Sequence, residues 1–129
     1  MTPTQDLPLA GWKVLIVEDQ FLIASDMKRI VAALGGETIG PCRSVDQARE
    51  LLASCSPDFA LLDINLDDKP VFELAEELSR RGVPFVFASG YDDFAIPEPH
   101  RHVPRLDKPL SRADLEQAVL RLRAGVSPP

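Results

Sequence analysis

The stretch Phe59-Ala60-Leu61-Leu62-Asp63-Ile64-Asn65 places four consecutive apolar residues directly before a carboxylate. A half-exposed strand would alternate apolar and polar residues, so this unbroken run predicts a strand that is buried on both faces of a parallel sheet. Ligands bind in the crevice beyond the carboxyl ends of such strands, which predicts that Asp63 points into a site. The alternative, that Asp63 only begins a turn or caps a helix, fits this stretch equally well.

Composition and charge limit the possible functions. The 129 residues, of which 45% are hydrophobic, predict one domain with its own core. A net charge of −6 argues against nucleic-acid binding. Cys42 and Cys55 are too far apart for a CxxC pair, and the first eleven residues have the pattern of neither a signal peptide nor a membrane span. We therefore expect a cytoplasmic protein with reduced thiols and no membrane contact.

Apolar runs alternate with helical periodicity along the chain. Strands are predicted at residues 14–17, 37–40, 59–62, 84–88 and 103–106, and helices at residues 23–34, 45–52, 71–78 and 111–122. The prolines at 97, 99 and 104 leave room for only a short or irregular fourth helix between the last two strands. This alternation predicts a doubly wound α/β sheet in one domain of residues 12–123, between flexible segments at 1–11 and 124–129.

Four of these strands end next to side chains that can bind ions or phosphate. They are Glu18 and Asp19, Asp63, Ser89, and Lys108. Carboxylates that meet at one sheet edge repel one another by roughly 4 kcal/mol for each close pair at an effective dielectric of 20, so either protons or a cation must be present. Carboxylate oxygens suit Mg²⁺, while an ammonium and a hydroxyl suit phosphoryl oxygens. The strand ends therefore predict a site for a phosphoryl group.

Asp63 is the best-placed nucleophile of this predicted site, where it would form an aspartyl phosphate. Ser89 and Tyr91 are not excluded as nucleophiles by the sequence, but neither has a neighbouring base. His100 and His102 lie in the proline-rich segment without an orienting partner and are interpreted as surface residues.

The pattern Glu18-Asp19, Asp63, Ser89 and Lys108-Pro109 resembles the receiver domain of two-component response regulators (CheY-like) over residues 12–123. The segment Pro84-Phe85-Val86-Phe87-Ala88-Ser89-Gly90-Tyr91 is similar to the Phe-Ala-Thr-Gly-Tyr (FATGUY) signature of a subgroup of single-domain receivers, mostly alphaproteobacterial, with serine in place of threonine. The resemblance implies a flavodoxin-like (βα)5 fold with strand order 2-1-3-4-5.

The resemblance also implies a magnesium-dependent phosphorelay. Asp63 would accept a phosphoryl group from a histidine kinase or a phosphotransfer protein. Mg²⁺, or Mn²⁺, would be held by Asp19, by Asp63 and by the backbone carbonyl of Asn65, with Glu18 acting through a water molecule. The protein would catalyse only its own phosphorylation and dephosphorylation, so it is not expected to be an enzyme in the ordinary sense.

Further roles follow from the same resemblance. Ile64 and Gly90 would offer backbone N–H groups to the phosphate, and Lys108 would bind it directly. The Lys108–Pro109 peptide bond would be cis. Ser89 would move toward the phosphate and so signal the modified state.

The position of the usual switch aromatic departs from the family pattern. Arg105 stands three residues before the lysine, where most receivers have a switch aromatic. Tyr91 is a candidate replacement that would reposition when Ser89 engages the phosphate, although it could equally well only pack on its loop.

The output is predicted to be a protein–protein contact, made by a stand-alone monomeric receiver whose downstream partner the sequence does not name. A role as a phosphate sink fits the same residues. One alternative is a pseudo-receiver that binds partners without being phosphorylated. A less favoured one is a small aspartate-nucleophile phosphatase, which would need an acid two residues after Asp63, where Asn65 stands.

Overall fold

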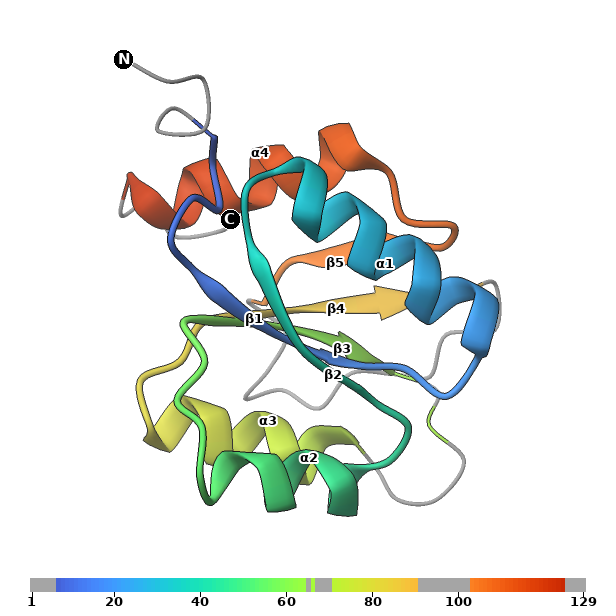
Figure 1. Cartoon of the computed structure of the whole chain (residues 1–129), viewed down its shortest axis with the longest axis vertical. Helices are drawn as coiled ribbons and strands as arrows, with labels where there is room; N and C mark the ends of the chain where they lie inside the picture. The colour runs from blue at the N-terminus through green and yellow to red at the C-terminus, as the bar shows by residue number, and fades with distance from the viewer. Residues whose placement is uncertain (1–6, 65, 67–70, 91–102, 125–129) are drawn as a thin grey trace.

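The computed structural model describes residues 7–64, 66, 71–90 and 103–124 (Figure 1). The strands are β1 (Lys13–Val17), β2 (Glu37–Cys42), β3 (Phe59–Asp63), β4 (Phe85–Ser89) and β5 (Arg105–Asp107), and the helices are α1 (Phe21–Ala33), α2 (Val45–Leu52), α3 (Val71–Arg80) and α4 (Arg112–Arg123). All strand pairs are parallel, in the order β2-β1-β3-β4-β5. This confirms the predicted doubly wound α/β fold. The short helix predicted between β4 and β5 falls almost entirely outside the described residues.

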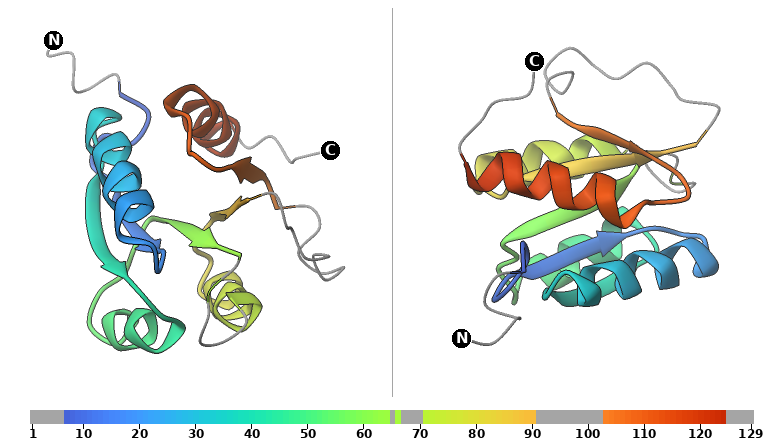
Figure 2. Two further views of the ribbon diagram at one scale, coloured as in Figure 1. Left: turned by 90° about the vertical axis from the view of Figure 1, so that its right-hand side faces the viewer. Right: turned by 90° about the horizontal axis from the view of Figure 1, so that it is seen from above.

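The helices cover both faces of the sheet. Helices α1 and α4 pack on one face, and α2 and α3 pack on the other (Figure 2). Every residue of β3 and of β4 is buried, because each strand has a neighbour on both sides and a helical layer on both faces. The apolar run that ends at Asp63 is therefore a central strand, as predicted. In the described part of the chain, no helix is long and apolar enough to span a membrane.

Local signals in the sequence fix where helices begin and end. Ser44 caps α2, because its hydroxyl accepts a hydrogen bond from the backbone N–H of Gln47 at 3.1 Å. The Gln47 side chain in turn accepts from the backbone N–H of Arg43 at 2.7 Å, one residue earlier than in the standard capping box. After α1, Gly35 adopts a φ of +94°, which L-residues rarely adopt, so the predicted glycine stop is confirmed.

Strands β2 and β5 differ from their predicted bounds. β2 continues past residue 40 to Cys42, and a register shift against β1 accommodates the irregular stretch. Gly40 makes this possible, since its φ is +97° and a Cβ there would lie 2.6 Å from the backbone nitrogen of Cys42. The peptide bond to Pro41 is cis. β5 begins at Arg105 and not at residue 103, which leaves it with only three residues.

Residues 7–12, the described part of the segment before β1, pack against the domain, although a loose arm was predicted over residues 1–11. Leu9 is fully buried, and its backbone N–H donates to the carbonyl of Leu34 at 2.9 Å. Arg123 lies over the ring of Trp12, 4.2 Å from its centroid, and also donates to the carbonyl of Pro8. Leu9 follows Pro8 in a short segment without apolar periodicity, so no pattern in the sequence predicts this packing.

Replacing Leu9 with alanine is expected to lower the free energy of unfolding by about 2–4 kcal/mol, because it leaves a cavity at the end of the α1/α4 core. Urea denaturation measures this loss. The matched control is Leu22→Ala, at a side chain that is 78% exposed, where the change should stay within about 0.5 kcal/mol. A loss below about 1 kcal/mol for Leu9→Ala would show that this segment contributes little to the core.

Candidate functional site

The carboxyl edge of the sheet brings the predicted site residues together. β1 leads into Glu18 and Asp19, β3 ends in Asp63, β4 ends in Ser89, and Lys108 follows β5. The backbone N–H of Lys108 donates to the carbonyl of Ser89 at 2.8 Å, which holds the lysine against the end of β4. The parallel topology thus brings five residues from four separate segments of the sequence into one cluster.

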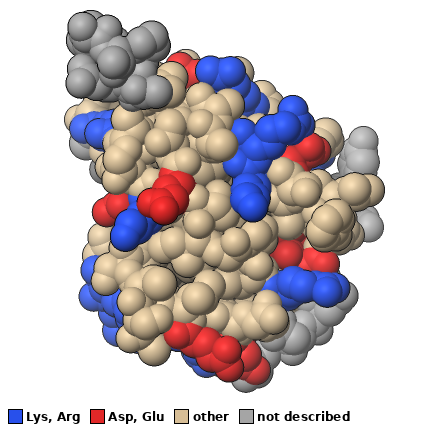
Figure 3. Space-filling model, in the orientation of Figure 1, with Lys and Arg blue, Asp and Glu red and all other residues tan. Residues whose placement is uncertain are grey.

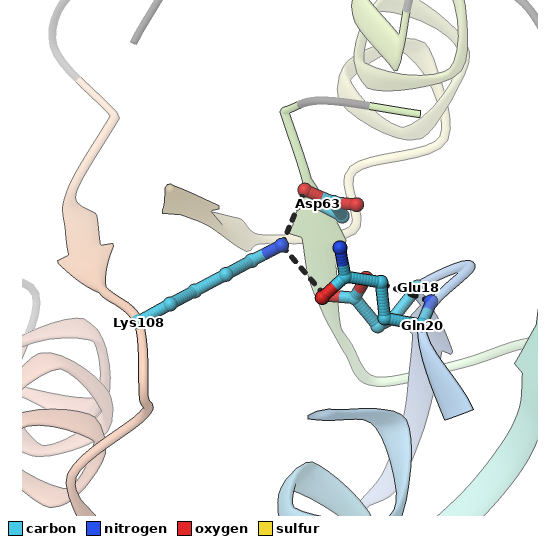
Figure 4. Close-up of polar contacts among 4 residues, drawn as sticks. All are labelled: Glu18, Gln20, Asp63 and Lys108. Atoms are coloured by element: carbon cyan, nitrogen blue, oxygen red, sulfur yellow. Dashed lines mark hydrogen bonds and ion pairs between the residues drawn. The ribbon is translucent and has the colours of Figure 1, made fainter. Parts of the chain in front are cut away.

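Lys108 is the centre of the cluster (Figure 4). Its Nζ lies 2.7 Å from Oδ1 of Asp63 and 2.8 Å from Oε1 of Glu18. Both carboxylates are about 1% exposed, and the lysine side chain is 12% exposed. The other oxygen of Glu18 accepts a hydrogen bond from the backbone N–H of Gln20 at 3.1 Å. One ammonium therefore bridges two buried carboxylates from different strands.

Asp19 completes a group of three carboxylates. One oxygen from each of Glu18, Asp19 and Asp63 lies within 4.8 Å of the others. Lys108 supplies a single positive charge against these acids, so the cluster favours an additional cation. Carboxylate oxygens are the ligands that Mg²⁺ prefers, and Mg²⁺ keeps several waters besides one or two carboxylates. The donor set therefore fits Mg²⁺.

The pKa values of Glu18 and Lys108 are both raised, for different reasons. Burial raises the pKa of Glu18 to about 7, and the charge of Asp63 adds to this, while the bond to Lys108 works against it. Burial on its own would lower the pKa of Lys108, but the bonds to Asp63 and Glu18 outweigh it, so this pKa is raised. Lys108 is thus charged at neutral pH, and Glu18 titrates near neutrality.

Ser89 presents a buried hydroxyl beside the cluster. Among the described residues, its Oγ has no hydrogen-bond partner, although the residue is only 1% exposed. A buried hydroxyl without a partner is unfavourable, so a hydrogen bond to a ligand at this position would be stabilising. A phosphoryl oxygen on the neighbouring strand end would provide that partner.

The remaining predicted residues have varied outcomes. The Lys108–Pro109 peptide bond is cis, as the resemblance implied. The N–H of Ile64, expected to face the phosphate, instead donates to the carbonyl of Ala88 at 3.1 Å, because the pairing of β3 with β4 extends to Asp63 and Ala88. Gly90 is half-buried next to Ser89. The positions assigned to Asn65, Tyr91 and the two histidines lie outside the described residues.

Sequence reasoning missed the backbone groups that hold Glu18. Its N–H donates to the carbonyl of Cys42 at 2.8 Å, and its side chain accepts from Gln20. Backbone donors and acceptors are present at nearly every residue, so no residue type marks them. Gly40 is a sequence feature related to these backbone contacts, because it shapes the end of β2 beside Glu18.

Comparison with known families is consistent with this geometry. The sequence model described as "Response regulator receiver domain" matches residues 14–120, which include all five clustered side chains. The chain belongs to this family. Receiver domains bind Mg²⁺ at an acidic pocket and act as signalling modules of two-component systems, interacting with histidine kinases or phosphotransfer proteins.

Two named proteins are similar to this chain over part of their own length. The sensory transduction protein LytT of Bacillus cereus is 37% identical over 87 residues, which are 65% of this chain and 35% of LytT. The positive alginate biosynthesis regulatory protein of Pseudomonas aeruginosa is 32% identical over 82% of this chain and 45% of its own length. The receiver domain thus spans less than half the length of these curated relatives.

Solved structures agree with this placement. The solution structure of SdrG from Sphingomonas melonis Fr1 superposes with a TM-score of 0.78 and 32% identity, and the match covers 90% of this chain and 98% of SdrG. The response regulator PhyR from Brucella abortus has a TM-score of 0.71 and 27% identity over 95% of this chain and 54% of PhyR. PhyR is described as a response regulator, and both matches cover at least 90% of this chain, so the fold agrees with the family.

Proposed function

We propose that this receiver domain is phosphorylated on Asp63 by a histidine-phosphorylated protein. An oxygen of Asp63 forms a bond to phosphorus while the P–N bond to the donor imidazole breaks. The electron pair of that bond goes to the ring nitrogen, which takes up a proton. The product is an aspartyl phosphate at the carboxyl end of β3.

The observation that carries this proposal is the buried contact between Asp63 and Lys108. The lysine holds the carboxylate at 2.7 Å and is itself fixed by Glu18. After transfer, the same ammonium can bind a phosphoryl oxygen, and the unpartnered Ser89 hydroxyl can donate to another. The site therefore already contains groups suited to the charge that phosphorylation brings.

A divalent metal is part of the proposal. Asp19 and Asp63 would hold Mg²⁺ directly, and Glu18 would support it from its buried position. When bound, the metal neutralises charge on the transferring phosphoryl group. The contribution of the chain is to fix the carboxylates and to keep Lys108 charged.

Protein–protein contact is the output that we propose. SdrG, which matches over nearly its whole length, has also been solved in a BeF3-activated conformation. That structure matches this chain with 33% identity and a TM-score of 0.72. This relative supports a receiver that changes conformation in a phosphoryl-like state without a second domain in the solved chain. A monomer that binds its target in the phosphorylated state is the simplest form of this proposal.

Intact-mass spectrometry with acetyl phosphate and Mg²⁺ tests the phosphorylation. We expect one added phosphoryl group on the wild type and none on Asp63→Asn, because the amide oxygen is a poor nucleophile. Binding of beryllofluoride, followed by NMR, covers the case in which the adduct hydrolyses too fast to observe. Silence in both experiments would favour a pseudo-receiver, and equal labelling of Asp63→Asn would place the phosphate elsewhere.

A further inference from the structure

A pocket of about 360 Å³ opens beside the acidic cluster, between the start of α1 and the end of β2. Glu18 and Asp19 line its acidic side, and Phe21 lines it from the first turn of α1. Two cations complete the lining: Lys28 from α1 and Arg43 from the residues after β2. Here we call Lys28 and Arg43 the cationic rim. The pocket thus combines both signs of charge next to the nucleophile.

The two side chains of the cationic rim are available to an external anion. Both residues are exposed, and neither forms an ion pair with a carboxylate in the part of the chain that the structure describes, whereas the adjacent Arg29 pairs with Asp26 at 2.7 Å. Figure 3 shows basic side chains over α1 and beyond the end of β2, with acidic side chains between them. Lys28 and Arg43 are therefore cationic groups beside the site with which carboxylates of a partner could pair.

Exposed apolar side chains next to the pocket indicate that this partner is a macromolecule. Phe21 and Leu22 are 80% and 78% exposed, and they are consecutive at the start of α1. A small donor such as acetyl phosphate cannot reach Asp63 and also cover two large side chains on the helix surface. A protein surface can do both, with its reacting group in the site and apolar contacts beside it.

We propose that the cationic rim selects phosphodonors in which the phosphohistidine is flanked by acidic side chains. Lys28 and Arg43 would pair with those carboxylates while the phosphoryl group enters the site at Asp63. This inference rests on the proposed phosphorylation of Asp63. Exposed ion pairs are individually weak and mainly speed association, so two of them should change the transfer rate by about three- to tenfold.

Two synthetic peptides provide the test. Each carries one phosphohistidine made with phosphoramidate, and the peptides differ only in having glutamates or lysines on both sides of it. The second-order rate of transfer to wild-type protein is measured by intact mass, and the quantity compared is the ratio of the two rates. We expect the glutamate peptide to be about three- to tenfold faster at low salt, with a smaller ratio at 0.5 M NaCl.

Reversing the charges of the cationic rim tests whether these two residues cause the difference between the transfer rates of the two peptides. In the double variant Lys28→Glu, Arg43→Glu, the ratio should fall to one or below, because the new carboxylates repel the glutamate peptide. Arg121→Glu is the matched control: it reverses an exposed charge at the far end of α4 and should leave the ratio as in the wild type. The same ratio in all three proteins would overturn the inference.

Acetyl phosphate separates this inference from the proposed function. If it labels Asp63 in the wild type but the two peptides react equally, or the glutamate peptide does not react, the phosphorylation proposal stands and the role of the rim fails. If none of the three donors labels Asp63 and beryllofluoride does not bind, the proposed function itself fails, and the rim inference fails with it.

Discussion

Removal of divalent metal with EDTA is expected to slow the transfer from acetyl phosphate to Asp63 by about 100-fold or more. Three carboxylates share the site, and Lys108 contacts two of them. An incoming phosphoryl group adds further negative charge. One lysine cannot offset all of this, so the reaction needs a second cation at the cluster.

The initial rate of adduct formation, measured with and without Mg²⁺, checks this expectation. Asp19→Asn should reduce the rate at fixed Mg²⁺, because it removes a carboxylate from the group of three. Glu76→Gln, an exposed carboxylate on α3, is the matched control and should behave as the wild type. Equal rates in EDTA and in Mg²⁺ would contradict a metal role.

Mg²⁺ should also stabilise the folded protein in the absence of any phosphodonor. A ligand at 100 times its dissociation constant adds about 2.7 kcal/mol to the free energy of unfolding when it binds only the native state. A melting temperature that rises with Mg²⁺ in the wild type, but not in Asp19→Asn, would show that binding occurs at this cluster. This measurement does not depend on phosphorylation, so it separates metal binding from catalysis.

The centre of the sheet could be predicted from the sequence because its signals are strong and local. The unbroken apolar runs of β3 and β4 have only one common explanation, which is burial on both faces. Once those strands are parallel, topology alone brings Asp63, Ser89 and Lys108 to one edge. The candidate site therefore followed from strand order and residue type, without any knowledge of side-chain contacts.

Other features depend on contacts that no residue type announces. Leu9 is buried in one cluster with residues of α1 and α4, and the extension of β2 comes from the positive φ of Gly40. The N–H of Ile64 is used in a hydrogen bond to Ala88, and the sequence does not show how far the pairing of β3 with β4 extends. Likewise, the sequence places Glu18 and Lys108 in one crevice, but only the structure shows that they form a direct ion pair.

Replacement of Lys108 with methionine is expected to lower the free energy of unfolding by about 3–5 kcal/mol at pH 8 in metal-free buffer. The methionine keeps most of the side-chain volume but leaves Glu18 and Asp63 buried without their shared cation. Arg121→Met, at an exposed arginine, is the matched control and should change stability by no more than about 0.5 kcal/mol.

The loss in Lys108→Met should depend on pH, and the sign follows from Glu18. Burial already raises the pKa of Glu18 to about 7 in the wild type, and loss of the lysine raises it further. A carboxyl whose pKa is raised on folding favours the folded state below its unfolded pKa of 4.5, and this contribution is lost as pH rises through the folded value. The variant should therefore be close to wild-type stability near pH 5 and much less stable at pH 8.

A second substitution identifies which charge is responsible. Adding Glu18→Gln to Lys108→Met removes one of the two stranded carboxylates, so it should restore a large part of the stability at pH 8 and flatten the pH dependence. Urea denaturation of the four proteins of this double-mutant cycle, at pH 5.5 and pH 8, measures the coupling. If Lys108→Met lost the same stability at both pH values, packing of the lysine chain and not its charge would hold the site together.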